Sequence, residues 1–136
     1  MDTDLYLDDE TEPDAELNEI SNAVIGAAIE VHRTLGPGFL ESVYEEAMAI
    51  EMRLCGIPFS RQHRFQITYK GVVVGKGSLD FLVRERVIVD LKTIDVFTKR
   101  ETAQMVSYLS ATNKALAIML NFNVHRLKEG IRRVAL

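Results

Sequence analysis

The sequence predicts an α/β domain in which a mixed central sheet is flanked by helices, in the order α-α-β-β-β-α-β. Three observations predict this fold. Apolar residues recur at helical spacing in the first third of the chain, and they alternate with polar residues in the middle third. A second helical pattern then separates the middle third from a short apolar run. With 136 residues, of which 47% are apolar and 26% charged, the chain has room for one hydrophobic core.

Two amphipathic helices open the predicted domain. The first is expected over residues 15–34, with Asp14 as its N-cap and Gly36-Pro37-Gly38 after its end. Its apolar face consists of Leu17, Ile20, Val24, Ala27, Val31 and Leu35. The second helix is expected over residues 39–54. Its apolar residues at helical spacing, which we expect to face the core, are Leu40, Val43, Ala47, Ile50 and Leu54.

The strands follow once the apolar period changes to two. A strand that includes residues 65–69 is followed by a turn at Lys70-Gly71 and by a strand that begins with three valines. Residues 79–92 contain two short apolar strands, and sequential strands of this kind favour an antiparallel meander.

The last third of the chain returns to helix and then to strand. A third helix is expected over residues 100–112, with Ala103, Val106 and Leu109 inward. Residues 115–122 form a buried strand by composition, and we expect this strand to pair beside the meander after the helical crossover. The final residues, 130–136, fit either a last strand or a short helix.

Charge is distributed unevenly along the chain. Nine of the 20 acidic residues lie in the first 19 positions, so the rest of the chain holds 11 acidic against 16 basic side chains, a balance of +5. We expect residues 1–13 to be a disordered acidic tail and residues 14–136 to be the folded domain. The alternative is that the tail covers a basic groove and competes with a polyanion, which nucleic-acid binding by a truncated protein would reveal.

Several functional classes are not favoured by the sequence. No apolar run approaches the ~20 residues of a membrane span. The acidic amino terminus is unlike a secretory signal, so we expect a cytoplasmic protein. The three histidines are widely separated and match no metal-ligand spacing, and no phosphate-binding glycine loop is present.

Three charged residues interrupt the apolar strands of residues 79–92. Asp80 lies in one strand, and Asp90 and Lys92 lie two apart in the next, so these two side chains point to the same face. Ionised groups in a hydrophobic strand are costly to desolvate unless they are paired or bind a metal. The three residues are therefore candidates for function.

The loop between these two strands decides whether the carboxylates meet. If residues 84–86 form a three-residue loop, Phe81 lies opposite Val89. One residue further from the loop, Asp80 lies opposite Asp90. A two-residue loop without a bulge would place the two carboxylates on opposite faces. The functional interpretation therefore requires an odd loop or a bulge.

Two facing carboxylates beside a lysine suit metal-assisted hydrolysis of a phosphodiester. Adjacent carboxylates repel each other, and Mg²⁺ or Mn²⁺ would relieve the repulsion through oxygen ligands. A bound metal polarises the phosphoryl oxygen and activates water, and the lysine can orient that water or stabilise developing charge. The alternative is an Asp–Lys ion pair at the end of a strand.

Polar residues on two helices belong to the same hypothesis. Glu41, Tyr44 and Glu45 share one flank of the second helix, and Gln104 and Tyr108 lie one turn apart on the third. The alternative is that both are ordinary solvated helix faces.

In order along the chain, these residues resemble a known family. Gly38-x-x-Glu41-x-x-Tyr44, Asp80, Asp90-Leu91-Lys92 and Gln104-x-x-x-Tyr108 are similar to the motifs of the GxxExxY proteins, which belong to the PD-(D/E)XK nuclease superfamily. The resemblance runs from about Ile20 to the carboxyl terminus and implies a restriction-endonuclease-like core.

The resemblance also implies roles for residues. Asp80 and Asp90 would bind Mg²⁺, Lys92 would be the catalytic lysine, Glu41 would approach the metal, and Gln104 would be the polar helix residue near it. Two positions depart from the family pattern. Most relatives have Glu where this chain has Asp90, and relatives often have His where this chain has Glu101.

Three functions are compatible with these observations. The leading hypothesis is a Mg²⁺-dependent nuclease or phosphodiesterase that acts on DNA or RNA. The second is a catalytically inactive nucleic-acid-binding module, whose phosphate contacts would be Arg61, Arg64, Lys70, Lys99, Arg100, Arg132 and Arg133. The third is a protein-interaction domain, with a homodimer formed through the apolar helices.

Overall fold

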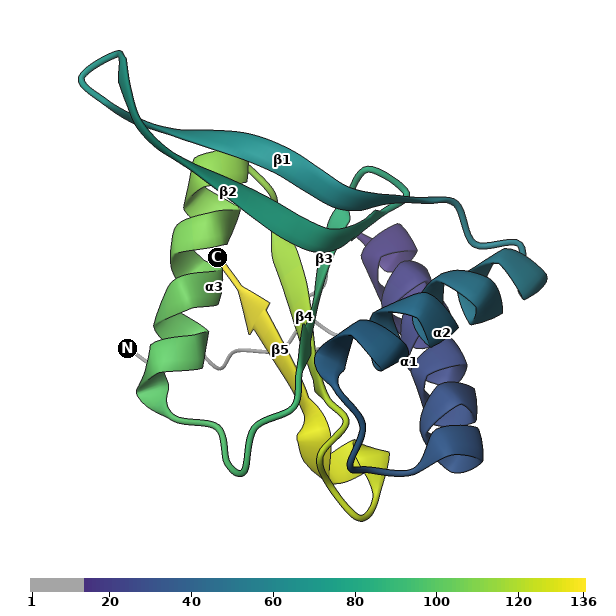
Figure 1. Cartoon of the computed structure of the whole chain (residues 1–136). Coiled ribbons are helices and arrows are strands. Elements are labelled where there is room, and N and C mark those ends of the chain that lie inside the picture. Colours follow the sequence, from purple (N-terminus) through teal and green to yellow (C-terminus); the bar gives the residue numbers. More distant parts are fainter. Residues whose placement is uncertain (1–13) are drawn as a thin grey trace.

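A computed structural model describes residues 14–136, which form a five-stranded mixed sheet with helices on both faces (Figure 1). Helices α1 (Ala15–Leu35) and α2 (Glu41–Leu54) cover one face, and α3 (Lys99–Thr112) covers the other. The predicted α/β class and the two-sided helical cover are confirmed. The predicted disordered tail, residues 1–13, lies outside the described residues. No helix within residues 14–136 is long and apolar enough to cross a membrane.

The strands lie in the sheet in their order along the chain. They are β1 (Phe59–Tyr69), β2 (Val72–Val83), β3 (Val87–Lys92), β4 (Leu116–Asn121) and β5 (Ile131–Ala135). Neighbouring strands are antiparallel except β3 and β4, which are parallel because α3 carries the chain from the end of one to the start of the other. The predicted meander and the crossover strand are confirmed.

The carboxyl-terminal segment resolves the alternative left by its sequence. A short 3₁₀ helix, Leu127–Gly130, precedes β5, so the observed order gains one strand over the predicted one. β5 pairs antiparallel with β4. β4 therefore has a neighbour on each side, and because core clusters cover both of its faces, all six of its residues are buried.

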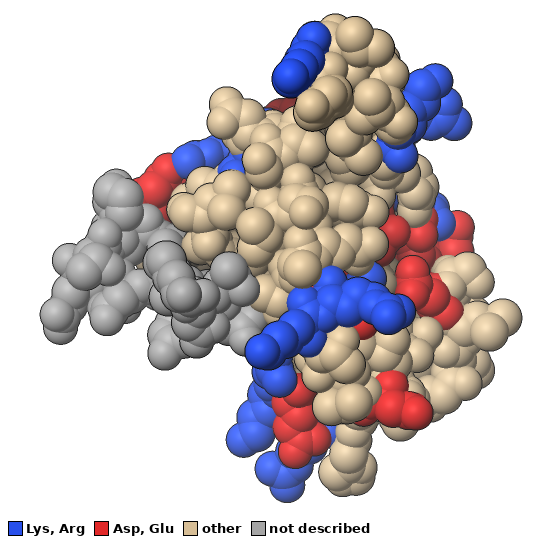
Figure 2. Space-filling model, turned by 90° about the vertical axis from the view of Figure 1, so that its left-hand side faces the viewer, with Lys and Arg blue, Asp and Glu red and all other residues tan. Residues whose placement is uncertain are grey.

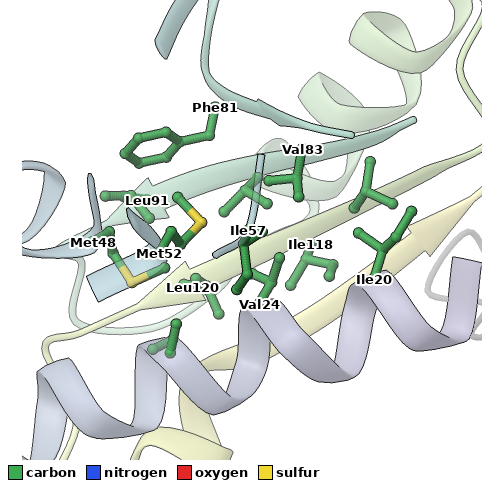
Figure 3. Close-up of a cluster of buried hydrophobic side chains, with 14 of the residues drawn as sticks. Ile20, Val24, Met48, Met52, Ile57, Phe81, Val83, Leu91, Ile118 and Leu120 are labelled. Carbon is green, nitrogen blue, oxygen red and sulfur yellow. The ribbon is translucent and has the colours of Figure 1, made fainter. Parts of the chain in front are cut away.

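The larger core cluster lies between the sheet and the α1–α2 layer (Figure 3). The predicted inward face of α1 is buried, apart from its partly buried last member, Leu35. The predicted inward face of α2 is wrong except for Ala47, which packs partly buried against this cluster. Leu54 is 77% exposed and Ile50 54% exposed, whereas the buried residues of α2 are Tyr44, Met48, Ala49 and Met52. The exposed and the buried apolar residues of α2 both repeat at helical spacing. Packing against α1 and the sheet determines that the set with Tyr44 and Met48 faces the core.

The smaller cluster lies between the other face of the sheet and α3. Met105 and Leu109 of α3 are buried in it, whereas the predicted inward residue Ala103 is exposed. Val106 lies at the edge of the cluster, partly buried. The inward face of α3 is therefore rotated by about one residue from the predicted one.

The hairpin of β1 and β2 projects beyond the sheet. β2 pairs with β3 only over residues 81–83, so residues 62–80 continue as a two-stranded ribbon, here called the β1–β2 arm (Figure 1). The base of the arm packs on α3, where the ring centroids of Phe65 and Tyr108 are 5.0 Å apart. The turn at the tip is Lys70-Gly71, as predicted.

Where the β1–β2 arm leaves the sheet, the side chains of β2 switch the side of the sheet to which they point. Leu79 packs in the α3 cluster, but Phe81, two residues on, packs in the α1–α2 cluster. Residues two apart on a strand normally share a face, so the hairpin twists sharply at Asp80. Gln62, which the register places opposite Asp80, has a φ of 51°. This left-handed conformation is costly for a residue other than glycine, and it marks the point of the twist.

Candidate active site

The turn between β2 and β3 has the length that the carboxylate pairing requires. Residues 84–86 separate Val83 from Val87, which are paired, and Phe81 pairs with Val89. Arg84 and Glu85 adopt left-handed φ angles of 52° and 61°, which suit the twist of a tight hairpin. The predicted register is confirmed as far as Phe81, and Asp80 and Asp90 are the next residues beyond this last pair, one on each strand.

Lys92 links β3 to α3. Its Nζ atom lies 3.0 Å from Asp90 Oδ2 and donates a hydrogen bond of 3.0 Å to Gln104 Oε1. Gln104 in turn donates from Nε2 to the Tyr108 hydroxyl at 3.3 Å. The structure therefore brings the Asp-x-Lys motif of β3 into contact with the Gln-x-x-x-Tyr motif of α3. The four residues in contact are Asp90, Lys92, Gln104 and Tyr108. Gln104 restricts the lysine side chain from the α3 side of the sheet.

Asp90 is a buried carboxylate that lacks full compensation. The residue is only 7% exposed, and its Oδ2 has no hydrogen-bond partner among the described residues. Lys92 Nζ lies 3.0 Å from this oxygen and offsets its charge in part. Burial raises the pKa of Asp90 to about 6, with Lys92 opposing the change and Asp80 adding to it. A buried oxygen of this kind is costly unless a further partner meets it, and residues 14–136 supply no hydrogen bond to it.

The pKa of Lys92 responds to the same cluster. Burial of the amine acts to lower this pKa, but the neighbouring carboxylates, Asp90 foremost, raise it overall. The lysine is therefore a fixed cation at neutral pH.

Asp80 is held in place by the backbone of the neighbouring strand. Its Oδ2 accepts a 2.8 Å hydrogen bond from the amide of Leu91, and its Oδ1 accepts a longer one, 3.4 Å, from Gln62 Nε2. Burial raises the pKa of Asp80, and the hydrogen bond from Leu91 opposes that increase. The side chain thus completes the edge of β3 where the backbone pairing with β2 has ended.

Glu41 is positioned by the loop between α1 and α2. It is the first residue of α2, and Gly38, three residues before it, has a φ of 110° that favours glycine. The Tyr44 hydroxyl donates to the carbonyl of Gly36 at 2.5 Å and accepts from the amide of Phe39 at 3.2 Å. The Gly-x-x-Glu-x-x-Tyr spacing is therefore a device that fixes the start of this helix.

The Tyr44 ring is anchored as well, because it stacks on Phe122 with centroids 4.6 Å apart. Although Glu41 is exposed at the surface, its pKa is raised by partial desolvation and by the charges of Asp80 and Asp90. All three acidic residues therefore act on one another electrostatically.

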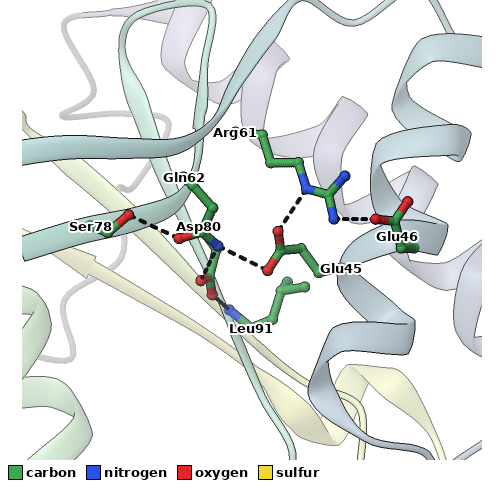
Figure 4. A network of polar contacts seen from close by, with 7 residues as sticks. All are labelled: Glu45, Glu46, Arg61, Gln62, Ser78, Asp80 and Leu91. Atoms are coloured by element: carbon green, nitrogen blue, oxygen red, sulfur yellow. Dashed lines mark hydrogen bonds and ion pairs between the residues drawn. The ribbon is translucent and has the colours of Figure 1, made fainter.

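A second polar network adjoins Asp80 and was not predicted (Figure 4). Gln62 Nε2 donates to Glu45 Oε1 at 2.9 Å, and Ser78 Oγ donates to Gln62 Oε1 at 2.9 Å. Arg61 then donates to both Glu45 and Glu46 at 2.6 Å. Gln62 belongs to no motif and lies on a strand that precedes the charged segment. The only local signal is its positive φ, which a sequence does not display.

Glu101 explains one departure from the family pattern. It forms a capping box at the start of α3, where its Oε1 accepts a 2.6 Å hydrogen bond from the amide of Thr98. The hydrogen bonds from Thr98 lower the pKa of Glu101. This carboxylate is therefore engaged in starting the helix that presents Gln104.

The donor set suits a hard divalent cation, although the ligands do not yet converge. Glu41, Asp80 and Asp90 offer carboxylate oxygens, which Mg²⁺ and Mn²⁺ prefer, and the orphaned Asp90 Oδ2 fits such a ligand. Within residues 14–136, however, no three side chains of the metal-ligating types lie close enough together to hold an ion as they stand. Both oxygens of Asp80 already accept hydrogen bonds. Coordination by all three would require Asp80 and Glu41 to reorient.

Comparison with known proteins is consistent with this arrangement. The family model of the PD-(D/E)XK nuclease superfamily matches residues 18–134, which include every candidate site residue. No curated protein matches the chain significantly. The match extends to the superfamily, and the narrower GxxExxY assignment stays a prediction. On the extent of this match, the chain belongs to the PD-(D/E)XK nuclease superfamily.

Proposed function

We propose that this protein is a nuclease that uses Mg²⁺ or Mn²⁺ to hydrolyse phosphodiester bonds of DNA or RNA. The observation that carries the proposal is the buried Asp90 carboxylate, whose Oδ2 lacks a hydrogen-bond partner within residues 14–136 and lies 3.0 Å from Lys92 Nζ. A buried carboxylate whose charge one lysine offsets only in part is costly to keep, which favours a functional role. Membership of the superfamily supports a nucleic-acid substrate.

Each site residue has a role under this proposal. Asp80, Asp90 and Glu41 would hold the cation, which when bound would polarise the phosphoryl oxygen and make water a better nucleophile. Lys92 is placed to orient the attacking water or to stabilise negative charge that develops on the phosphate. Gln104 Oε1 accepts a hydrogen bond from the Lys92 amine and so holds it in place, which makes Gln104 a positioning residue.

A catalytically inactive nucleic-acid-binding module is the second candidate. It is favoured by the engagement of both Asp80 oxygens in hydrogen bonds and by the lack of three converged ligands in the described part of the chain. Of the basic residues expected to contact phosphates, Arg61 is engaged by Glu45 and Glu46, and Arg133 donates to Ser21. Arg64 and Lys70 are exposed on the β1–β2 arm.

A homodimer through the helices stays a separate prediction. The outer stripe of α2 exposes large apolar side chains, namely Leu40, Val43, Ile50 and Leu54. A surface of this kind is typical of an interface. Measurement of the solution mass tests the prediction, and a monomer at micromolar concentration would refute it.

The test of the nuclease proposal compares wild type with Lys92→Ala. Single- and double-stranded DNA and RNA are incubated with each protein and Mg²⁺ or Mn²⁺, and single-turnover cleavage is followed on gels. We expect Lys92→Ala to cleave roughly 10²–10³-fold more slowly, because it removes a cation from the site of charge development. Lys128→Ala, which changes an exposed lysine in the short 3₁₀ helix before β5, is the matched control and should cleave like wild type.

Two results would count against the enzyme. Equal cleavage rates for wild type and Lys92→Ala would place the activity elsewhere. Metal-independent binding without cleavage, unchanged by Asp80→Asn, would favour the inactive binding module.

A further inference from the structure

A strip of polar side chains runs from the candidate site along one face of the β1–β2 arm. Asp80, Gln62 and Ser78 are joined by hydrogen bonds and therefore share a face (Figure 4). Alternation along β2 puts Lys76 on the face of Ser78. The register then adds Arg64, which pairs with Ser78, and Gln66, which pairs with Lys76. The strip beyond the site thus consists of Arg64, Gln66, Lys76 and Ser78, all of them exposed.

The arm has the charge that a polyanion requires. Residues 63–79 contain Arg64, Lys70 and Lys76 but neither Asp nor Glu. Arg61, just before the arm, is engaged by two glutamates, whereas none of these three cations forms an ion pair with a described carboxylate. Figure 2 shows basic side chains on both flanks of the arm, at the top of the molecule. The arm therefore presents uncompensated positive charge beside a site rich in carboxylates.

The shape of the β1–β2 arm indicates which form of nucleic acid it would bind. A two-stranded ribbon fits the major groove of B-form DNA, whereas the major groove of A-form RNA is too narrow for side chains to read. At roughly 3.3 Å per residue, the eight residues of β1 from position 62 to 69 span about 26 Å, most of one helical turn of a duplex. The strip carries no aromatic residue, so it offers no platform on which the bases of a single strand could stack.

We propose that the polar strip of the β1–β2 arm lies in the major groove of duplex DNA and directs that duplex to the carboxylate site. The inference rests on the proposed function for the class of substrate, and it adds the form of nucleic acid and the surface that binds it. Arg64 and Lys76 contact phosphates that flank the groove, and Gln66 faces the base edges. The other face of the arm base is occupied, since Phe65 and Leu79 pack toward α3.

The experiment measures binding without cleavage. Fluorescence anisotropy with a labelled 20-base-pair DNA duplex is recorded in EDTA over a range of salt concentrations, for wild type and for Arg64→Gln/Lys76→Gln. Arg126→Gln/Lys128→Gln removes two exposed cations at the opposite end of the molecule and is the matched control. Thermal melting verifies that all three proteins are folded. The same three proteins are also tested for cleavage with Mg²⁺.

We expect the arm variant to bind roughly 10- to 100-fold more weakly at moderate salt, and its salt slope to fall by about two, because two phosphate contacts are lost. The control should bind like wild type. Equal losses in both variants, or no loss in the arm variant, would overturn the inference. So would wild-type binding to single-stranded DNA or to an RNA duplex as tight as to the DNA duplex.

These experiments distinguish a failure of the DNA-binding inference from a failure of the proposed nuclease function. If the wild type and the arm variant cleave duplex DNA at the same rate under subsaturating conditions, the inference fails and the nuclease stands. If arm-dependent duplex binding is observed but no protein cleaves, the inference stands and the nuclease fails.

Discussion

Two adjacent polar clusters in this protein differ in how well their charged groups are hydrogen-bonded. In the network of Arg61, Glu45 and Gln62, the guanidinium and amide donors meet carboxylate acceptors at 2.6–2.9 Å. In the Asp90–Lys92 pair, a buried oxygen has no hydrogen-bond partner among residues 14–136. The first cluster pairs its charges through hydrogen bonds, whereas among the described residues the second offsets its buried charge by one ion pair with Lys92.

Exposure accounts for the energetic difference. In the Arg61–Glu46 pair, 30% of the Arg61 side chain and 65% of the Glu46 side chain are exposed, so water screens this pair and it contributes little to stability. Asp90 is 7% exposed, and its attraction to Lys92 does not offset the cost of burying its charge, as its raised pKa indicates.

The largest expected effect on stability comes from removing the buried, only partly compensated charge of Asp90. Burial raises the pKa of Asp90 from 3.8 to about 6, so the folded protein binds this proton more tightly than the unfolded chain does. Stability conferred by the protonated form is therefore lost as pH rises from about 4 to about 6. Asp90→Asn should stabilise the metal-free protein by roughly 1–3 kcal/mol at pH 7, and this gain should vanish below about pH 4. Urea unfolding at several pH values measures it.

Exposed Asp95→Asn is the control for this substitution and should change the free energy of unfolding by less than about 0.5 kcal/mol. If Asp90 is a metal ligand, Mn²⁺ should raise the Tm of wild type and leave that of Asp90→Asn unchanged. A loss of stability in Asp90→Asn at pH 7 would show that the pair with Lys92 is structural, and the contrast between the clusters would disappear.

An intermediate effect is expected at Gln62, where the two clusters meet. Gln62→Gly and Gln62→Ala both remove the side chain that joins Glu45 to Asp80, but only glycine tolerates a φ of 51° without strain. We expect the glycine variant to be more stable than the alanine variant by about 1 kcal/mol. Equal stability in thermal and urea unfolding would mean that the backbone at the twist is not strained.

The smallest effect is expected in the satisfied network. Glu46→Gln removes one partner of Arg61 at the surface, and the hydrogen bonds from Arg61 that lower the pKa of Glu46 are lost with it. Because Arg61 keeps Glu45, we expect Tm to fall by only about 1–2 °C in low salt and by less in high salt. A decrease comparable in size to the effect of Asp90→Asn would show that this network is more than a screened surface contact.

The sequence was a good guide wherever a single periodicity decided the outcome. The apolar residues on either side of residues 84–86 suggested a three-residue loop with Phe81 opposite Val89, and the strands pair in that register. The period failed for α2, because its residues offer two apolar stripes and only packing with α1 and the sheet chooses between them. It also could not separate strand from short helix in the five residues of β5.

The candidate site was predictable in its charged members and unpredictable in its supports. Asp80, Asp90 and Lys92 are conspicuous because charges are rare in apolar strands. Gln62 and Glu45 belong to elements whose relative placement depends on the twist of the arm, and no pattern within either segment reports that contact. The orphaned oxygen of Asp90 is likewise a property of three-dimensional packing.

The turn at Arg84–Arg86 has a consequence for how chains of this kind can diverge. Arg86 pairs with Asp14 and Glu16, so the turn is fastened to the first residues of α1. A strand reverses its two faces with every residue gained or lost, so a one-residue insertion here would turn Val87, Val89 and Leu91 away from the core and part the two aspartates. The tip at Lys70-Gly71 carries no such penalty. Related sequences should therefore vary in length at the tip of the β1–β2 arm and keep a constant length at the turn of residues 84–86.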